Sequence, residues 1–132
     1  MRRLFSLLIG IVVSSCSMMQ HNHEGVTITD IKFDTQGNSL EDTDDMREVC
    51  SEFTLTEEQV RTYYFESRLS TEQEVHDYYN ILPCNSIGTM VINGKLFSWI
   101  IRAGGVGGFE SEDKSFVRVC DERCCKRTKG IC

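Results

Sequence analysis

The chain has too few histidines, too little positive charge and too few signature motifs for several common classes of protein. It contains three histidines, so a serine–histidine–aspartate arrangement outside the N-terminal region would have to use His76. It has no C-x-x-C, G-x-G-x-x-G or P-loop pattern, the usual indications of thiol redox chemistry or nucleotide binding. Fourteen lysines and arginines stand against 20 acidic residues, and this balance argues against a nucleic-acid-binding domain.

The N-terminal segment has the order of an export signal. Two arginines at positions 2 and 3 precede an apolar run over residues 4–13, and two small serines follow it. The run is shorter than the roughly 18 residues needed to cross a bilayer. We therefore predict a signal peptide over residues 1–15 and no transmembrane helix at this place.

The end of this segment, Val13-Ser14-Ser15-Cys16, resembles the lipobox of bacterial lipoproteins, in which an aliphatic and two small residues precede a lipidated cysteine. The resemblance covers only about the first 17 residues. It implies a diacylglyceryl group on the Cys16 thiol, cleavage before Cys16, and acylation of the new amino group, for which palmitate is the expected chain. Several acyl chains would give stable anchoring. The alternative is ordinary secretion, with a type I peptidase cutting after Ser15 or Ser17.

The resemblance also implies a location. Cleavage would leave 117 of the 132 residues, and loss of two arginines would change the formal net charge from −6 to −8. We expect a lipidated tether over residues 16–25 and a single domain over residues 26–132. Serine at position 17 is similar to the outer-membrane sorting signal of Gram-negative lipoproteins, so the expected place is the cell envelope, and the outer membrane if there are two membranes.

Six cysteines remain when Cys16 is assigned to lipid, and an even number in an exported domain predicts disulfide bonds. Fifteen pairings are possible. We favour Cys50 with Cys84, because this bridge closes a segment that reads as two helices. The other four would form two short bridges that staple the C-terminal tail, and pairing of the adjacent two is disfavoured: Cys120, Cys124, Cys125 and Cys132.

The pattern along residues 26–102 predicts strands around a helical middle. Residues 26–33 are β-branched and aromatic and lead into a turn at 34–38; their apolar residues change face midway, which indicates a bulge or an edge strand. Thr56 with Gln59 forms a capping box for a helix that runs to about residue 67. The same device at residues 70–74 predicts a second helix that ends near residue 80.

In the C-terminal half, the sequence predicts a hairpin, then a break in the sheet, and then a last strand. Asn93-Gly94 joins two apolar runs within residues 87–102 and favours a type I′ turn. One face of the second run carries Phe97, Trp99 and Ile101 and is the better candidate to contact the helices. A glycine-rich segment over residues 103–109 should then break the sheet, and residues 115–120 read as the last strand.

These elements predict an α+β domain: a small, mostly antiparallel sheet with two short helices packed on one face, stapled by disulfides. Two groups of residues are candidates for contact with a partner. The first is the tyrosines on the two helices, although helix packing explains them better than a binding face does. The second is the glycines of the loop. The candidates are Tyr63, Tyr64, Tyr78, Tyr79, Gly104, Gly105, Gly107 and Gly108.

We expect no metal site and no cofactor. Asp42, Asp44 and Asp45 offer oxygen ligands, but the glycine and closing glutamate of a calcium loop are missing. The tail cysteines would need to be reduced to bind zinc, and they lack paired knuckles. His21 and His23 in the tether would bind a transition metal only weakly.

The sequence carries no catalytic constellation, so we expect a protein that is not an enzyme. The function it favours is a lipid-anchored, disulfide-stabilised interaction module: an inhibitor, an immunity-type protein or an accessory subunit. Its expected partners are the membrane, through the anchor, and an unknown envelope protein, with no nucleic acid. The alternatives are a small envelope hydrolase, using His76 or a carboxylate pair, and a ligand carrier between sheet and helices.

Overall fold

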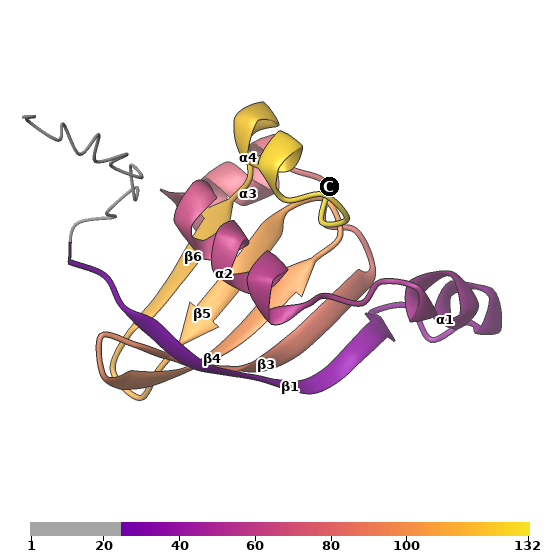
Figure 1. Cartoon of the computed structure of the whole chain (residues 1–132). Coiled ribbons are helices and arrows are strands. Elements are labelled where there is room, and N and C mark those ends of the chain that lie inside the picture. The colour runs from indigo at the N-terminus through magenta and orange to yellow at the C-terminus, as the bar shows by residue number, and fades with distance from the viewer. Residues whose placement is uncertain (1–24) are drawn as a thin grey trace, which may run out of the picture.

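The computed structural model describes residues 25–132, which form one six-stranded sheet with four helices (Figure 1). The expected signal peptide, Cys16, Ser17 and the tether histidines lie outside the described residues.

All neighbouring strands are antiparallel, and their order across the sheet is β1-β3-β4-β5-β6-β2. The strands are β1 (Ile28–Ser39), β2 (Arg68–Ser70), β3 (Cys84–Ile92), β4 (Lys95–Arg102), β5 (Val106–Glu110) and β6 (Ser115–Val119). The helices are α1 (Asp44–Ser51), α2 (Glu57–Glu66), α3 (Glu72–Tyr78) and α4 (Glu122–Arg127). The prediction of an antiparallel α+β domain is confirmed.

The hairpin of β3 and β4 is the centre of the sheet. Its turn has φ of 49° at Asn93 and 80° at Gly94, the two positive values that a type I′ turn requires. Beyond the turn, Phe97, Trp99 and Ile101 of β4 are buried and their neighbours are more exposed. The hairpin and its inward-facing row are as predicted.

Strand β1 starts at Ile28, two residues after the predicted start. It continues through residues 34–38, so the prediction of a turn there is wrong. The chain stays extended because it pairs with β3 as far as Ser39 opposite Cys84. The pairing shifts register three times, and Asp30 has a φ of 52° at the first shift. The predicted bulge and edge position are confirmed, since β1 is the outermost strand on its side.

The two predicted helices exist and have the predicted caps. The Thr56 hydroxyl accepts from the Gln59 backbone N–H, and the Gln59 side chain accepts from the Thr56 backbone N–H. Thr71 caps α3 by accepting from the Glu74 backbone N–H, but this helix ends at Tyr78. Helices α1 and α4 and the three-residue strand β2, between α2 and α3, were not predicted from the sequence.

The glycine-rich segment breaks the sheet for only a few residues, so this prediction is too broad. Gly104 and Gly105 have φ of 92° and 86° and form the turn after β4. Residues 106–110 are strand β5, which pairs with β4 and β6. Neighbouring strands on both sides supply hydrogen bonds that outweigh the weak strand preference of glycine.

One face of the sheet, here the inner face, packs against α2 and carries the main core (Figure 1). Val60 and Tyr63 of α2 are fully buried there, beside Trp99 and Phe109 of the sheet. The indole of Trp99 meets Phe33 edge to face, with ring centroids 5.5 Å apart. This cluster supplies most of the buried apolar area, the dominant favourable contribution to folding.

The opposite face, here the outer face, is covered only at one end. Val75 of α3 packs with Val106 and Val119, and strand alternation places these on the other side of the sheet from Phe109 and Phe116. The prediction of two helices packed on one face is therefore not confirmed. Helix α3 cannot follow α2 onto the inner face because β2, between them, pairs with β6 and forms an edge of the sheet.

Three disulfides staple this fold, and the favoured pairing of Cys50 with Cys84 is confirmed. It joins α1, which projects beside the sheet in Figure 1, to the first residue of β3. The tail bridges are Cys120–Cys124 and Cys125–Cys132, so the adjacent pair is not bridged.

Replacing Cys50 and Cys84 together by alanine should lower the free energy of unfolding by about 2–4 kcal/mol, because the bridge restricts the unfolded chain. The matched control is the double alanine variant of Cys125 and Cys132. The sequence separations are 34 and 7, so chain entropy predicts a loss smaller by about 1 kcal/mol for the control. Urea unfolding without reductant measures both, and equal losses would contradict the expectation.

Candidate binding face

The outer face carries a row of four small or apolar residues across four neighbouring strands. The pairing places Ile87 of β3 beside Ile100 of β4, then Gly108 of β5, then Val117 of β6. All four are half-buried, and none belongs to the main core. The row is therefore an apolar stripe on a sheet face that no helix crosses, except at the α3 end.

Two hollows follow this stripe. One, of about 440 Å³, lies over the middle of the row and is bordered by Ser98 and Glu110. The other, of about 330 Å³, lies between the row and α3 and is bordered by Val75, Ile81 and Arg102. Both are lined by Ile100, Gly108 and Val117, so they form one continuous groove.

Gly108 contributes to the groove by having no side chain. A Cβ atom there would stand 3.3 Å from Cγ2 of Ile100, and no other heavy atom is close. The position therefore has room for more than glycine, and its openness on the outer face leaves space for an incoming group.

Further apolar side chains are exposed around the groove. Leu96 shares the outer face through its pairing with Val91 and is 62% exposed. Ile81 and Leu82, in the loop after α3, are 54% and 42% exposed. Isolated exposed apolar residues are ordinary, but a contiguous group with polar residues at its rim is typical of interaction surfaces.

A charged cluster holds α3 at its end of the groove. Arg68 of β2 donates to Glu74 of α3, with Nη2 to Oε1 at 2.5 Å, and the Glu74 carboxylate also accepts from the Ser70 hydroxyl. Arg68 beside Glu74 lowers the pKa of that carboxyl to about 2. Arg68 also donates to the Tyr79 hydroxyl at 3.1 Å. These hydrogen bonds hold α3, which forms one wall of the groove, against β2.

The four candidate tyrosines lie in different parts of the domain. Tyr63 is fully buried on the inner face, and the single proton of its hydroxyl is shared between the carbonyl oxygens of Gly105 and Arg118, at 3.1 and 2.8 Å. Burial raises its pKa well above the usual value. Tyr63 therefore stabilises the core, and a partner of the folded domain cannot contact its side chain.

The other three tyrosines differ in exposure. Tyr64 is half-buried, with Phe109 at 5.4 Å edge to face and the Arg118 guanidinium 4.7 Å above its ring. Tyr78 is 81% exposed. Tyr79, which follows α3, packs against the small outer cluster around Val75. Of the four tyrosines, Tyr79 is the one that packs at the candidate face.

The glycines also separate. Gly105 and Gly107 are buried, and a Cβ on Gly107 would come within 2.6 Å of the Tyr63 hydroxyl, so both positions allow close packing. Gly104 turns the chain beside Leu82. Gly108 lines both hollows of the groove, and Gly107 lines the smaller one.

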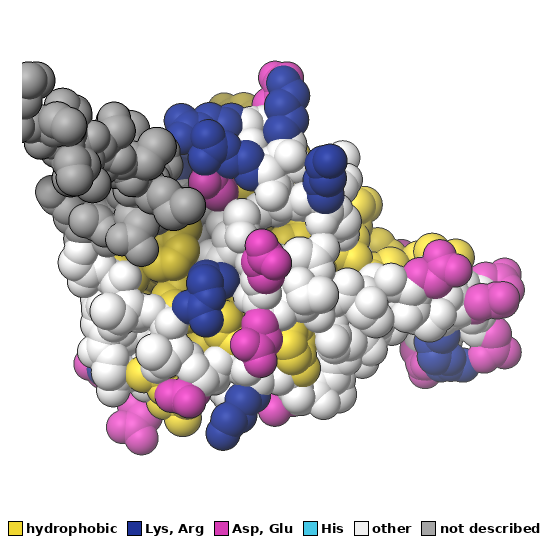
Figure 2. All heavy atoms as spheres, in the orientation of Figure 1, with side chains coloured by type: hydrophobic (Ala, Val, Ile, Leu, Met, Phe, Trp, Pro, Cys, Tyr) yellow, Lys and Arg dark blue, Asp and Glu magenta, His cyan; other side chains and the backbone are white. Residues whose placement is uncertain are grey.

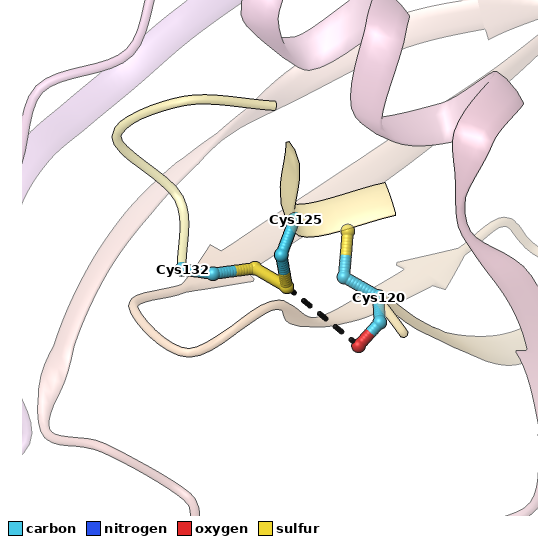
Figure 3. A group of neighbouring side chains, drawn as sticks. All are labelled: Cys120, Cys125 and Cys132. Carbon is cyan, nitrogen blue, oxygen red and sulfur yellow. Dashed lines mark hydrogen bonds between the residues drawn. A yellow bond between two sulfur atoms is a disulfide. The ribbon is translucent and has the colours of Figure 1, made fainter. Parts of the chain in front are cut away.

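The tail cysteines gather at the C-terminal end (Figure 3). Sulfur atoms of Cys120, Cys125 and Cys132 lie within 4.8 Å of one another. They belong to two disulfides, and a bridged sulfur lacks the thiolate that zinc binds. The role that the structure gives this cluster is to staple α4 and the chain end.

The acidic segment and the histidine lie away from the groove's middle. Asp42 and Asp44 both pair with Arg47 at the start of α1, and Thr43 caps that helix. Figure 2 shows acidic side chains around α1 and basic ones at the α4 end of the domain. His76 on α3 has an 85% exposed side chain, and its Nδ1 lies 3.0 Å from Oδ1 of Asp77.

Comparison with known protein families, with curated proteins and with solved structures finds no match for this chain. Among residues 25–132, no helix has both the length and the apolar character needed to cross a membrane.

Proposed function

We propose that this protein is a lipid-anchored interaction module of the cell envelope, which binds a protein partner through the outer face of its sheet. It would act as an inhibitor, an immunity-type protein or an accessory subunit. The observation that carries the proposal is the apolar stripe of Ile87, Ile100, Gly108 and Val117, left open on one side of a sheet whose other side holds the core.

The disulfides support the export part of the proposal. All six cysteines of residues 26–132 are bridged, and such bridges form and persist outside the reducing cytosol. Cys16 is then the one cysteine without an assigned partner, as the lipobox resemblance requires. Anchoring through Cys16 and the outer-membrane location remain inferences from that resemblance.

The shape of the face supports binding of a protein. The groove lies on the sheet, with apolar residues at its centre and Ser98 and Glu110 at its border. Interfaces between proteins commonly have such an apolar centre and a polar rim. A hydrolase remains the weaker alternative, because His76 on α3 is largely exposed and is bonded to Asp77 beside it in the chain.

A photo-crosslinking amino acid in place of Ser98 tests the proposal in intact envelopes of the source cells. Ser98 is exposed and borders the larger hollow, so we expect a discrete crosslinked product at one mass. Glu58, exposed on α2 at the opposite side, is the matched control and should give no such product.

Purified, unlabelled protein should compete away the product at position 98. Equal crosslinking from both positions, or none from position 98, would contradict a specific partner at the outer face.

A further inference from the structure

Arg102 stands out among the partly buried arginines of the described chain. It is the last residue of β4 and lines the smaller hollow of the groove beside α3. Its Nη1 is buried and has no hydrogen-bond acceptor among the described protein atoms. Arg61 and Arg118, also half-buried, both donate to backbone carbonyls, at Ile28 and Ser67.

The surroundings of Arg102 make its charge costly. The hollow is walled by Val75, Ile81, Val106 and Val117, and Glu72 and His76 also line it. None of the ion pairs among residues 25–132 includes Arg102. Burial lowers the pKa of Arg102. A half-buried cation with apolar neighbours is normally paired, so an anion that reaches the guanidinium would gain from a charge that no described protein group neutralises.

Resting on the proposed function, we infer that this hollow captures the C-terminal carboxylate of the partner chain, with an aliphatic last side chain beside Val75 and Val106. The shared chemistry is an aliphatic carboxylate: the guanidinium can donate two parallel hydrogen bonds to it, and the apolar walls take the side chain.

The size and charge of the hollow agree with a chain terminus. Its volume, about 330 Å³, lies at the lower end of the range for ligand pockets and suits one or two small side chains. Glu72 borders the same hollow, so an acidic residue just before the terminus would be repelled. A C-terminal residue carries a carboxylate and an aliphatic side chain on the same Cα atom, so it could contact Arg102 and the apolar walls together.

The test uses the full chain with its bridges intact and a fluorescein-labelled Ala-Ala-Leu peptide with a free carboxylate. Charge-assisted hydrogen bonds predict that it binds roughly 10 to 100 times more tightly than the same peptide with a C-terminal amide. Fluorescence anisotropy measures both. Arg102→Gln should abolish the difference, and Arg123→Gln, exposed on α4, should preserve it.

Three results would overturn the inference. The first is that the peptide with a free carboxylate shows no saturable binding, and the second is that the peptide amide binds equally well. The third is that octanoate competes more tightly than the peptide, which would assign the hollow to a free carboxylic acid. The Arg102→Gln variant must keep the wild-type melting temperature. If it does not, Arg102→Lys, which keeps the charge, replaces it and should retain part of the preference for the carboxylate. Full loss of that preference in Arg102→Lys would also count against the inference.

The crosslink from position 98 separates this inference from the proposed function. A crosslinked partner that Arg102→Gln leaves unchanged would sustain the outer face and reject capture of a C-terminus. Absence of the crosslinked product when Arg102 is present would reject the partner itself.

Discussion

Cys16→Ser should abolish incorporation of palmitate into this protein. If the lipobox resemblance is correct, the thiol of Cys16 is the acceptor of the diacylglyceryl group, and a hydroxyl cannot replace it in that step. Acylation is expected to fall to background, and the protein should leave the membrane fraction because several acyl chains anchor it. An alkyne-palmitate label followed by gel fluorescence measures the first effect, and fractionation of the envelope measures the second.

Ser14→Ala is the matched control, since it keeps a small residue before the cysteine and should leave labelling unchanged. A Cys16→Ser precursor that keeps residues 1–15 could stay at the membrane through its apolar run, and intact mass distinguishes this species. Retention of label, or of the processed mutant in the membrane fraction, would show that Cys16 is not the residue that anchors the protein.

Gly88→Ala should destabilise the domain by about 3 kcal/mol or more, at the upper end of the cost of overpacking a core. A Cβ at this position would stand 1.9 Å from the backbone oxygen of Lys32 and 2.5 Å from the Trp99 ring. The Trp99 ring is locked in the core and Lys32 belongs to the paired strand β1, so neither can move alone. We expect β1 to separate from β3 at this point.

Gly108→Ala is the control, because it also replaces a strand glycine without a positive φ and meets only Ile100, at 3.3 Å. Its expected change is within about 0.5 kcal/mol, as at most surface sites. Urea unfolding followed by the fluorescence of Trp99, the one tryptophan, measures both variants. Similar midpoints for the two would mean that the sheet yields at Gly88 more easily than its packing indicates.

The parts of the fold that local chemistry specifies were predictable. Asn93-Gly94 determines the hairpin because few other pairs tolerate two positive φ values, and Thr56 with Gln59 determines the start of α2. The alternation of β4 also assigned Trp99 to the core and left Ile100 on the other face.

The missed elements depend on partners distant in the chain. Strand β5 contains adjacent glycines and forms because β4 and β6 lie on either side of it. Strand β2 has three residues and is defined only by β6. Helices α1 and α4 are short, but caps at Thr43 and Asp121 and acidic first turns were visible signals that could have found them.

The candidate site was predictable only in part. Tyr63 looked like an amphipathic surface residue, yet its hydroxyl finds two carbonyls inside the core, and no pattern along the chain reveals those acceptors. Arg102 looked like an ordinary strand-end cation. Its importance depends on Val75 and Ile81, which come more than twenty residues earlier and meet it only in the folded domain.

The two edges of the sheet define how a partner can approach. On one side β1 shifts register three times, and on the other β2 is only three residues long. Neither edge offers an even ladder of free backbone groups, so a foreign strand would find no template for extending the sheet. The same irregularity opposes edge-to-edge aggregation between copies of the chain. If a protein partner binds as proposed, the side chains of the broad face are the groups left to recognise it.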